Sequence, residues 1–139
     1  MRRLLIAGLT LIACASVPSF ANDDSEMYPL ASALTKLAAA VEATVFETPG
    51  DQTEGPVLLA TATRDNPQLL APFARYTLHA KRDGGHAFVL VCSPDGLTAL
   101  LEDAGCSAKL DAHHWKAVPQ RPCAFTLTAA RACAVPRAP

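Results

Sequence analysis

His79 and His86 are the histidines of this chain whose spacing best suits metal binding. They lie on either side of a hairpin signal at residues 83–85, so the register decides whether they meet. A two-residue turn at 83–84 puts both rings on one sheet face, roughly 7–8 Å apart, which suits a shared copper or zinc ion. A three-residue turn points them to opposite faces. A polar sheet surface without a metal is the competing interpretation.

His114 is the third candidate metal ligand, because Asp111, three residues earlier, would share its side of a helix. The adjacent His113 would point about 100° away on a helix, so the histidine pair is a poor chelate. A surface or capping histidine is the competing interpretation. Trp115 follows directly, and a tryptophan here is typical of a core edge or an interface. We take Trp115 as the candidate interface residue.

Motifs of common enzymes are absent from the sequence. There is no Gly-x-Ser-x-Gly elbow, no phosphate-cradling glycine loop and no His-Glu-x-x-His pair. Glu102 and Asp103 are adjacent carboxylates, which diverge by about 100° on a helix and so do not face one bond. Their side chains are expected on the solvent side of that helix. We therefore expect no enzyme and no cofactor, with a small hydrolase whose site is assembled in space as an alternative.

Four cysteines follow the N-terminal region, and their spacing is typical of disulfides. They are separated by thirteen, sixteen and nine residues, so they form neither zinc knuckles nor a Cys-x-x-Cys motif. An even number of cysteines in a small exported domain usually means two disulfides. The four are Cys92, Cys106, Cys123 and Cys133.

The N-terminus has the pattern of a secretory signal peptide. Two arginines and an apolar run precede Ser-Phe-Ala, which offers the small residues that signal peptidase needs. The run is shorter than the roughly twenty residues of a membrane span. The sequence therefore predicts a signal peptide at 1–21 and a periplasmic or secreted mature chain at 22–139. A lipoprotein attached through Cys14 is the alternative.

Charge and composition are those of one small domain without a polyanionic partner. The chain has 139 residues, half of them hydrophobic, with twelve basic and thirteen acidic side chains mixed along its length. The sequence has no stripe of basic residues that would bind nucleic acid or anionic lipid. We also expect no transmembrane segment after the signal peptide. We expect a single domain at 22–139, with mobile ends at 22–28 and 134–139.

The first half of the mature chain is predicted to contain a helix, a loop and a strand. Apolar side chains recur every three to four positions in residues 29–46, which predicts an amphipathic helix. Residues 48–55 are rich in glycine and polar side chains and should form an exposed loop. The β-branched residues of 57–64 favour a strand. The run at 75–92 has the pattern of a hairpin whose second strand is apolar throughout.

A second helix is predicted at residues 94–104, where Ser93 suits an N-cap and Gly105 suits the C-terminal end. Together these elements predict an α+β fold. An N-terminal helix would pack on a small, mostly antiparallel sheet, with a second helix after the central strand and two disulfides.

The predicted second helix also restricts the pairing of the cysteines. At about 1.5 Å per residue, it would hold Cys92 and Cys106 too far apart for a disulfide. Two pairings remain, and we favour Cys106–Cys123 with Cys92–Cys133.

These observations favour a small, non-enzymatic protein-interaction module that works in the periplasm or outside the cell. Inhibitors, immunity proteins and envelope accessory subunits share this size and disulfide content. The expected partner is another envelope or secreted protein, contacted near Trp115 or the loop at 48–55. The alternatives are a copper- or zinc-binding protein that uses His79, His86 and His114, and the small hydrolase.

Overall fold

The computed structural model describes residues 23–107 and 111–133. The predicted signal peptide at 1–21, the candidate lipidation site Cys14 and the predicted mobile end at 134–139 lie outside the described residues. The α+β fold, the N-terminal helix on an antiparallel sheet and the two disulfides are confirmed.

Helix α1 runs from Asp24 to Glu47 and contains the predicted helix at 29–46. It begins earlier than predicted because the Asp23 carboxylate accepts a hydrogen bond from the Ser25 N–H and caps the first turn. Residues 24–28, predicted to be mobile, are therefore helical. By length and composition alone α1 would also suit a membrane span, as core helices of soluble proteins do. Its buried residues are Met27, Leu30, Ala31, Leu34, Leu37, Ala38, Val41 and Val45.

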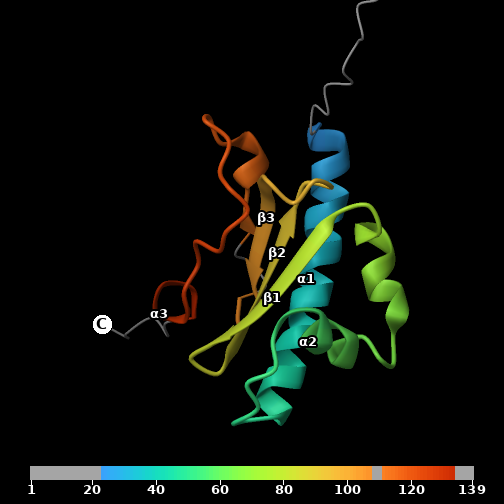
Figure 1. Ribbon diagram of the computed structural model, residues 1–139, viewed down its shortest axis with the longest axis vertical. Helices are drawn as coiled ribbons and strands as arrows, with labels where there is room; N and C mark the ends of the chain where they lie inside the picture. Colours follow the sequence, from blue (N-terminus) through green and yellow to red (C-terminus); the bar gives the residue numbers. More distant parts are fainter. Residues whose placement is uncertain (1–22, 108–110, 134–139) are drawn as a thin grey trace, which may run out of the picture.

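Four antiparallel strands form one sheet in the order β1-β2-β3-β4. Helix α1 lies across one side of this sheet, which we call the helix face (Figure 1). The predicted hairpin is confirmed, and its second strand is the buried central strand of the sheet. The strands are β1 (Thr77–Asp83), β2 (His86–Cys92), β3 (Ala99–Ala104) and β4 (Asp111–Ala112).

A second helix follows α1 where the sequence predicts a strand. Residues 57–64 lie mostly in α2 (Gly55–Ala62), which packs against β1 and α1, and 3-10 helix η1 (Pro67–Phe73) comes next. The strand prediction was wrong because tertiary contacts override the weak preference of β-branched residues. The Thr63 hydroxyl donates to the Leu59 carbonyl four residues earlier, as a helical backbone permits.

Residues 94–104, predicted to form a helix, instead form a tight turn and strand β3. The capping residues are used in the turn: Ser93 Oγ accepts from the Thr98 N–H, and Asp95 accepts from the Leu97 N–H. The same residue types cap helices and turns, so the signal was ambiguous. Every residue of β3 is buried, since the strand is covered on both faces.

Gly105 ends β3 rather than a helix, and it lies against α1. A Cβ atom added there would lie 2.5 Å from Glu42 Cβ and 2.7 Å from the Ala38 carbonyl oxygen. The glycine is therefore required by the close approach of β3 to α1.

The C-terminal strap, residues 113–133, lies against the other side of the sheet, the strap face (Figure 1). It contains η2 (His114–Lys116) and the short helix α3 (Ala129–Ala132). A small apolar cluster fills this face: Leu90, Cys92 and Ala99 of the sheet, with Cys123 and Phe125 of the strap.

Two disulfides tie the strap to the sheet, but not in the favoured pairing. The structure pairs Cys92 with Cys123 and Cys106 with Cys133. The favoured combination, Cys106–Cys123 with Cys92–Cys133, was wrong. Cys92 and Cys106 lie at the two ends of β2–β3 because the segment between them is a turn and a strand, and each meets a different part of the strap.

Candidate functional site

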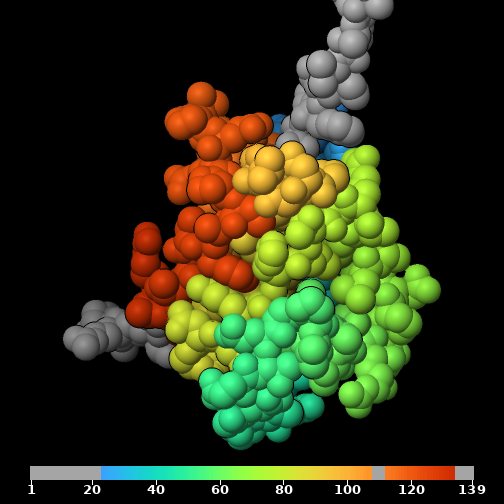
Figure 2. All heavy atoms as spheres, viewed as in Figure 1, coloured from blue at the N-terminus to red at the C-terminus, as the bar shows by residue number. Residues whose placement is uncertain are grey.

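Three large apolar side chains are exposed at the end of the molecule where α1 begins. Tyr28 of α1 is 50% exposed, Leu97 of the β2–β3 turn 69%, and Val118 of the strap 97%. We call these three residues the end patch. The three segments lie at the same end of the molecule (Figure 1), and the β2–β3 turn is exposed on its surface (Figure 2).

Trp115, the predicted interface residue, is largely buried and packs against Tyr28 of the end patch. It is only 9% exposed, and its indole N–H donates to Asp24 Oδ1 over 3.1 Å. Its ring meets Tyr28 edge to face with centroids 5.8 Å apart, and His113 at 4.6 Å. Trp115 therefore fixes η2 on the first turn of α1, and the exposed aromatic ring is that of Tyr28.

Lys116 adds a charged rim to the end patch. Its ammonium donates to the Tyr28 hydroxyl over 3.0 Å and lies 3.2 Å from Asp24 Oδ2. The hydrogen bonds from Trp115 and Lys116 lower the pKa of Asp24, and those to Tyr28 and Asp24 raise the pKa of Lys116. Both groups are therefore charged at neutral pH, and the rim carries one charge of each sign.

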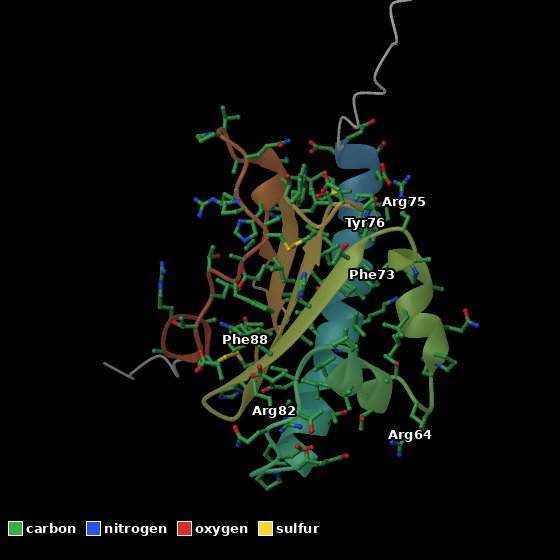
Figure 3. The ribbon with its side chains drawn as sticks, in the orientation of Figure 1. Arg64, Phe73, Arg75, Tyr76, Arg82 and Phe88 are labelled. Atoms are coloured by element: carbon green, nitrogen blue, oxygen red, sulfur yellow. A yellow bond between two sulfur atoms is a disulfide. The ribbon has the colours of Figure 1, made fainter. Side chains whose placement is uncertain are left out.

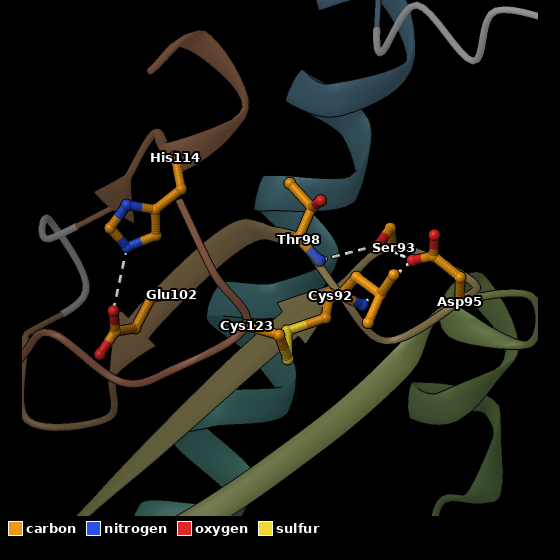
Figure 4. Close-up of a disulfide and its surroundings, with 8 residues drawn as sticks. Cys92, Ser93, Asp95, Thr98, Glu102, His114 and Cys123 are labelled. Atoms are coloured by element: carbon orange, nitrogen blue, oxygen red, sulfur yellow. Dashed lines mark hydrogen bonds and ion pairs between the residues drawn. A yellow bond between two sulfur atoms is a disulfide. The ribbon is translucent and has the colours of Figure 1, made fainter. Parts of the chain in front are cut away.

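Glu102 and His114 form a buried polar cluster that joins β3 to the strap (Figure 4). The Glu102 carboxylate lies 3.0 Å from His114 Nε2 and accepts hydrogen bonds from the Thr126 N–H, the Thr126 hydroxyl and the Leu127 N–H. Burial raises the pKa of Glu102, but these hydrogen bonds outweigh it, so the net shift lowers the pKa. The expected solvent-facing positions of Glu102 and Asp103 were wrong, because both are buried.

This cluster has the residue types of a hydrolytic triad without its geometry. Glu102 and the Thr126 hydroxyl both approach His114 through Nε2, at 3.0 and 3.5 Å. In a Ser-His-Asp relay the acid and the nucleophile use different ring nitrogens. The Thr126 hydroxyl donates to Glu102 instead. The contacts therefore clamp the strap to the sheet and do not activate a nucleophile.

The hairpin register keeps His79 and His86 apart. The turn lies at Gly84–Gly85, one residue later than in the shared-ion arrangement, so His86 pairs with Asp83 and His79 with Leu90. Four residues along a strand separate the two positions by about 13 Å. One ion therefore does not reach both rings.

Each histidine instead lies beside a disulfide. A ring nitrogen of His79 and the sulfurs of Cys92 and Cys123 all lie within 4.8 Å of one another, and His86 has the same relation to the other disulfide. The His86 ring is also tied to α1, with Nδ1 2.6 Å from Glu42 Oε1. Sequence reasoning missed both arrangements because they depend on the disulfide pairing.

The loop at 48–55, the other predicted interface, is held by Arg82 of β1. The guanidinium donates to the carbonyl oxygens of Thr48 and Thr53 and lies 3.4 Å from Asp51 Oδ2. Arg82 points from the hairpin toward this loop in Figure 3. Its side chain is only 10% exposed, so the cation is used within the fold.

A groove of about 430 Å³ lies between α1 and η1 and is largely apolar. Pro29 and Pro72 form part of its wall. The Tyr76 hydroxyl donates to Glu26 over 2.6 Å, and Arg75 pairs with the same carboxylate. The polar groups in its lining are thus paired with one another.

Comparisons with known proteins do not indicate a function for this chain. No protein-family model matches the chain, and neither the curated proteins nor the solved structures include a significant match.

Proposed function

We propose that this chain is a small exported protein-interaction module without catalytic activity, and that it contacts its partner through the end patch. The partner is another envelope or secreted protein. The two disulfides support export, since disulfides persist in oxidising compartments outside the cytoplasm. The main support for the proposed contact is the exposure of the three apolar side chains of the end patch.

The end patch has the composition of a binding surface. Tyr28 supplies an amphipathic ring, Leu97 and Val118 supply aliphatic contact, and Lys116 with Asp24 supplies a charged rim. Protein interfaces commonly combine an aromatic and apolar centre with a polar rim. Exposed apolar side chains gathered at one end cost solubility, which favours an explanation by contact with a partner.

Two residues of the end patch, Leu97 and Tyr28, are held in place before any partner arrives. Leu97 lies in a turn closed by Ser93 and Asp95, and its carbonyl accepts from the N–H of the disulfide-bonded Cys123. Tyr28 lies in α1 and contacts Trp115. A preformed surface loses less conformational entropy on binding than a flexible one.

Site-specific photo-crosslinking tests this proposal. A photo-reactive amino acid placed at position 118 should give one discrete cross-linked envelope protein, whereas the same probe at position 46 should not. Phe46 is the matched control because it is 82% exposed but lies at the other end of α1.

Charge substitutions give the quantitative readout. Leu97→Asp should weaken binding of the captured partner by at least about tenfold, as expected for a residue at an interface centre. Phe46→Asp should leave the affinity unchanged. Equal cross-linking from both positions, or equal affinity of both variants, would contradict a contact through the end patch.

A further inference from the structure

His79, Cys92 and Cys123 lie together on the strap face, with one ring nitrogen and two sulfurs all within 4.8 Å of one another. His79 reaches this face because it pairs with Leu90, a member of the strap-face cluster. Ligands that bind one ion at about 2.0–2.3 Å in a trigonal plane lie about 3.5–4 Å from one another. The fold therefore brings these three groups close to the spacing of a metal site.

Of the two histidines that lie beside a disulfide, His79 is the one whose ring is available for such a role. In the part of the chain that the structure describes, it takes part in no hydrogen bond or ion pair, whereas His86 contacts Glu42 and His114 contacts Glu102. His79 is exposed while Cys92 is fully buried. An ion could therefore arrive from solvent at the ring and contact the sulfurs beneath it.

We propose that His79, Cys92 and Cys123 form a copper(I) site that opens when their disulfide is reduced. While the two sulfurs are bonded to each other they are not thiolates and do not ligate a metal in this way. Reduction thus converts a structural disulfide into a metal site. This inference is independent of the proposed partner contact.

A dithiol reductant supplies the two electrons of this step. Its thiolate attacks the partly exposed Cys123 sulfur, which forms a mixed disulfide and releases Cys92 as the thiolate. The second thiol of the reductant then attacks the reductant sulfur of the mixed disulfide. This releases Cys123 as a thiolate, and the reductant leaves as its oxidised, disulfide form. Binding of one Cu⁺ to the two cysteines displaces their remaining protons to solvent.

The two thiolates make this ligand set well suited to copper(I). Thiolates are soft ligands that favour Cu(I), imidazole also binds copper, and three such ligands complete a trigonal Cu(I) site. Zinc bound by the same three groups would need a fourth ligand such as water, whereas Cu(I) would not. The bound Cu(I) with two thiolates carries a net charge of minus one. Lys81, on the same face of β1, complements that charge, since its ammonium lies 4.7 Å from the ring centroid of Phe125, which packs against the cluster that contains Cys92.

A copper transfer titration tests the site. The mature chain is reduced, freed of reductant under argon, and titrated against Cu(I) held by bicinchoninate, whose colour reports the copper that is withdrawn. Wild type is compared with His79→Asn, and His86→Asn is the matched control beside the other disulfide. X-ray absorption at the copper edge then identifies the ligands.

Reduced wild type should withdraw Cu(I), and His79→Asn should lower its affinity at least about tenfold, the loss typical even for groups that only support a ligand. His86→Asn should bind as wild type does, the oxidised chain should withdraw no copper, and X-ray absorption should show two sulfurs and one nitrogen. Equal affinities of His79→Asn and wild type would overturn the proposal, as would a copper bound by sulfur alone.

The test remains decisive if the reduced chain unfolds. Metal binding would then restore the fold, because a site absent from the unfolded chain couples binding to folding. Trp115 fluorescence should return to its native value with Cu(I) in wild type and not in His79→Asn. Recovery that does not depend on His79 would overturn the site.

Discussion

The two faces of the sheet are held by different kinds of interaction. On the helix face, α1 buries one apolar stripe against Ala87, Val89 and Val91 of β2 in the main core of the protein. On the strap face the apolar cluster is small, and two disulfides and the buried Glu102 hold the strap instead. A helix can bury a whole stripe, whereas an irregular segment has few apolar side chains and needs specific bonds.

The end patch lies where these two faces meet. Tyr28 comes from the helix that covers one face, and Trp115 and Lys116 come from the strap that covers the other. The position of the strap therefore decides the shape of the proposed contact surface. Substitutions on each face should show how much that face contributes to stability.

Leu34→Ala should give the largest effect, because it leaves a cavity in the apolar core of the helix face. Leu34 is fully buried, and such truncations cost about 2–5 kcal/mol of unfolding free energy. Urea unfolding measures the loss, and it should be global. Phe46→Ala, on the exposed side of the same helix, should change the free energy by no more than about 0.5 kcal/mol. Similar losses for both variants would contradict the assigned helix face.

Removal of the Cys92–Cys123 disulfide should cost about 3.5–4 kcal/mol, since it closes a loop with a sequence separation of 31. The double variant Cys92→Ser, Cys123→Ser should also loosen the strap before the helix face. Hydrogen exchange should accelerate more at the Thr126 and Leu127 amides than at Val89. Uniform acceleration would show that both faces open together.

Glu102→Gln should cost about 1–3 kcal/mol, because the charged acceptor of the strap hydrogen bonds is replaced by a neutral amide. Urea unfolding measures the cost at neutral pH. The conservative change keeps the side-chain shape, so a loss near zero would mean that the disulfides alone hold the strap.

The same carboxylate should make stability depend on acid. The pKa of Glu102 is lowered in the folded chain from its ordinary value of 4.5, so the folded state binds fewer protons than the unfolded state. Its contribution is fully present above about pH 4.5 and is lost as the pH falls through the lowered pKa. Unfolding free energies measured between neutral and acidic pH should therefore fall less steeply in Glu102→Gln. Parallel curves for variant and wild type would contradict the shift.

Lys116→Gln should have the smallest effect on stability. The ion pair with Asp24 is exposed to solvent, and such pairs contribute little to folding. The urea midpoint should match that of wild type within reproducibility. A clear loss would show that the rim of the end patch stabilises the contact between the strap and α1.

Sequence reasoning succeeded where burial is repetitive along the chain. The spacing of Leu30, Leu34 and Leu37 predicted α1, and the apolar run from Ala87 to Val91 predicted a central strand. It failed where one local pattern fits two structures. Ser93 and Asp95 cap a turn as readily as a helix, so the helix predicted at 94–104 was a strand.

The candidate sites were less predictable than the fold because they join distant segments. Trp115 was identified as a core edge or an interface, but its partner Asp24 lies 91 residues away in sequence. The neighbourhood of His79 depended on a one-residue choice of hairpin turn and on the disulfide pairing. The helix predicted at 94–104 excluded only the Cys92–Cys106 pairing, and the choice between the two pairings that remained was wrong.

The sequence by itself determined the α+β class, the amphipathic helix, the hairpin and the pairing of all four cysteines into disulfides, because hydrophobic periodicity and residue counts are local or additive properties. Tertiary structure alone decided the strand at β3, which cysteines pair, and which side chains face each other across the strap. These depend on contacts between residues far apart in sequence, and their energies exceed the local preferences that a sequence pattern records.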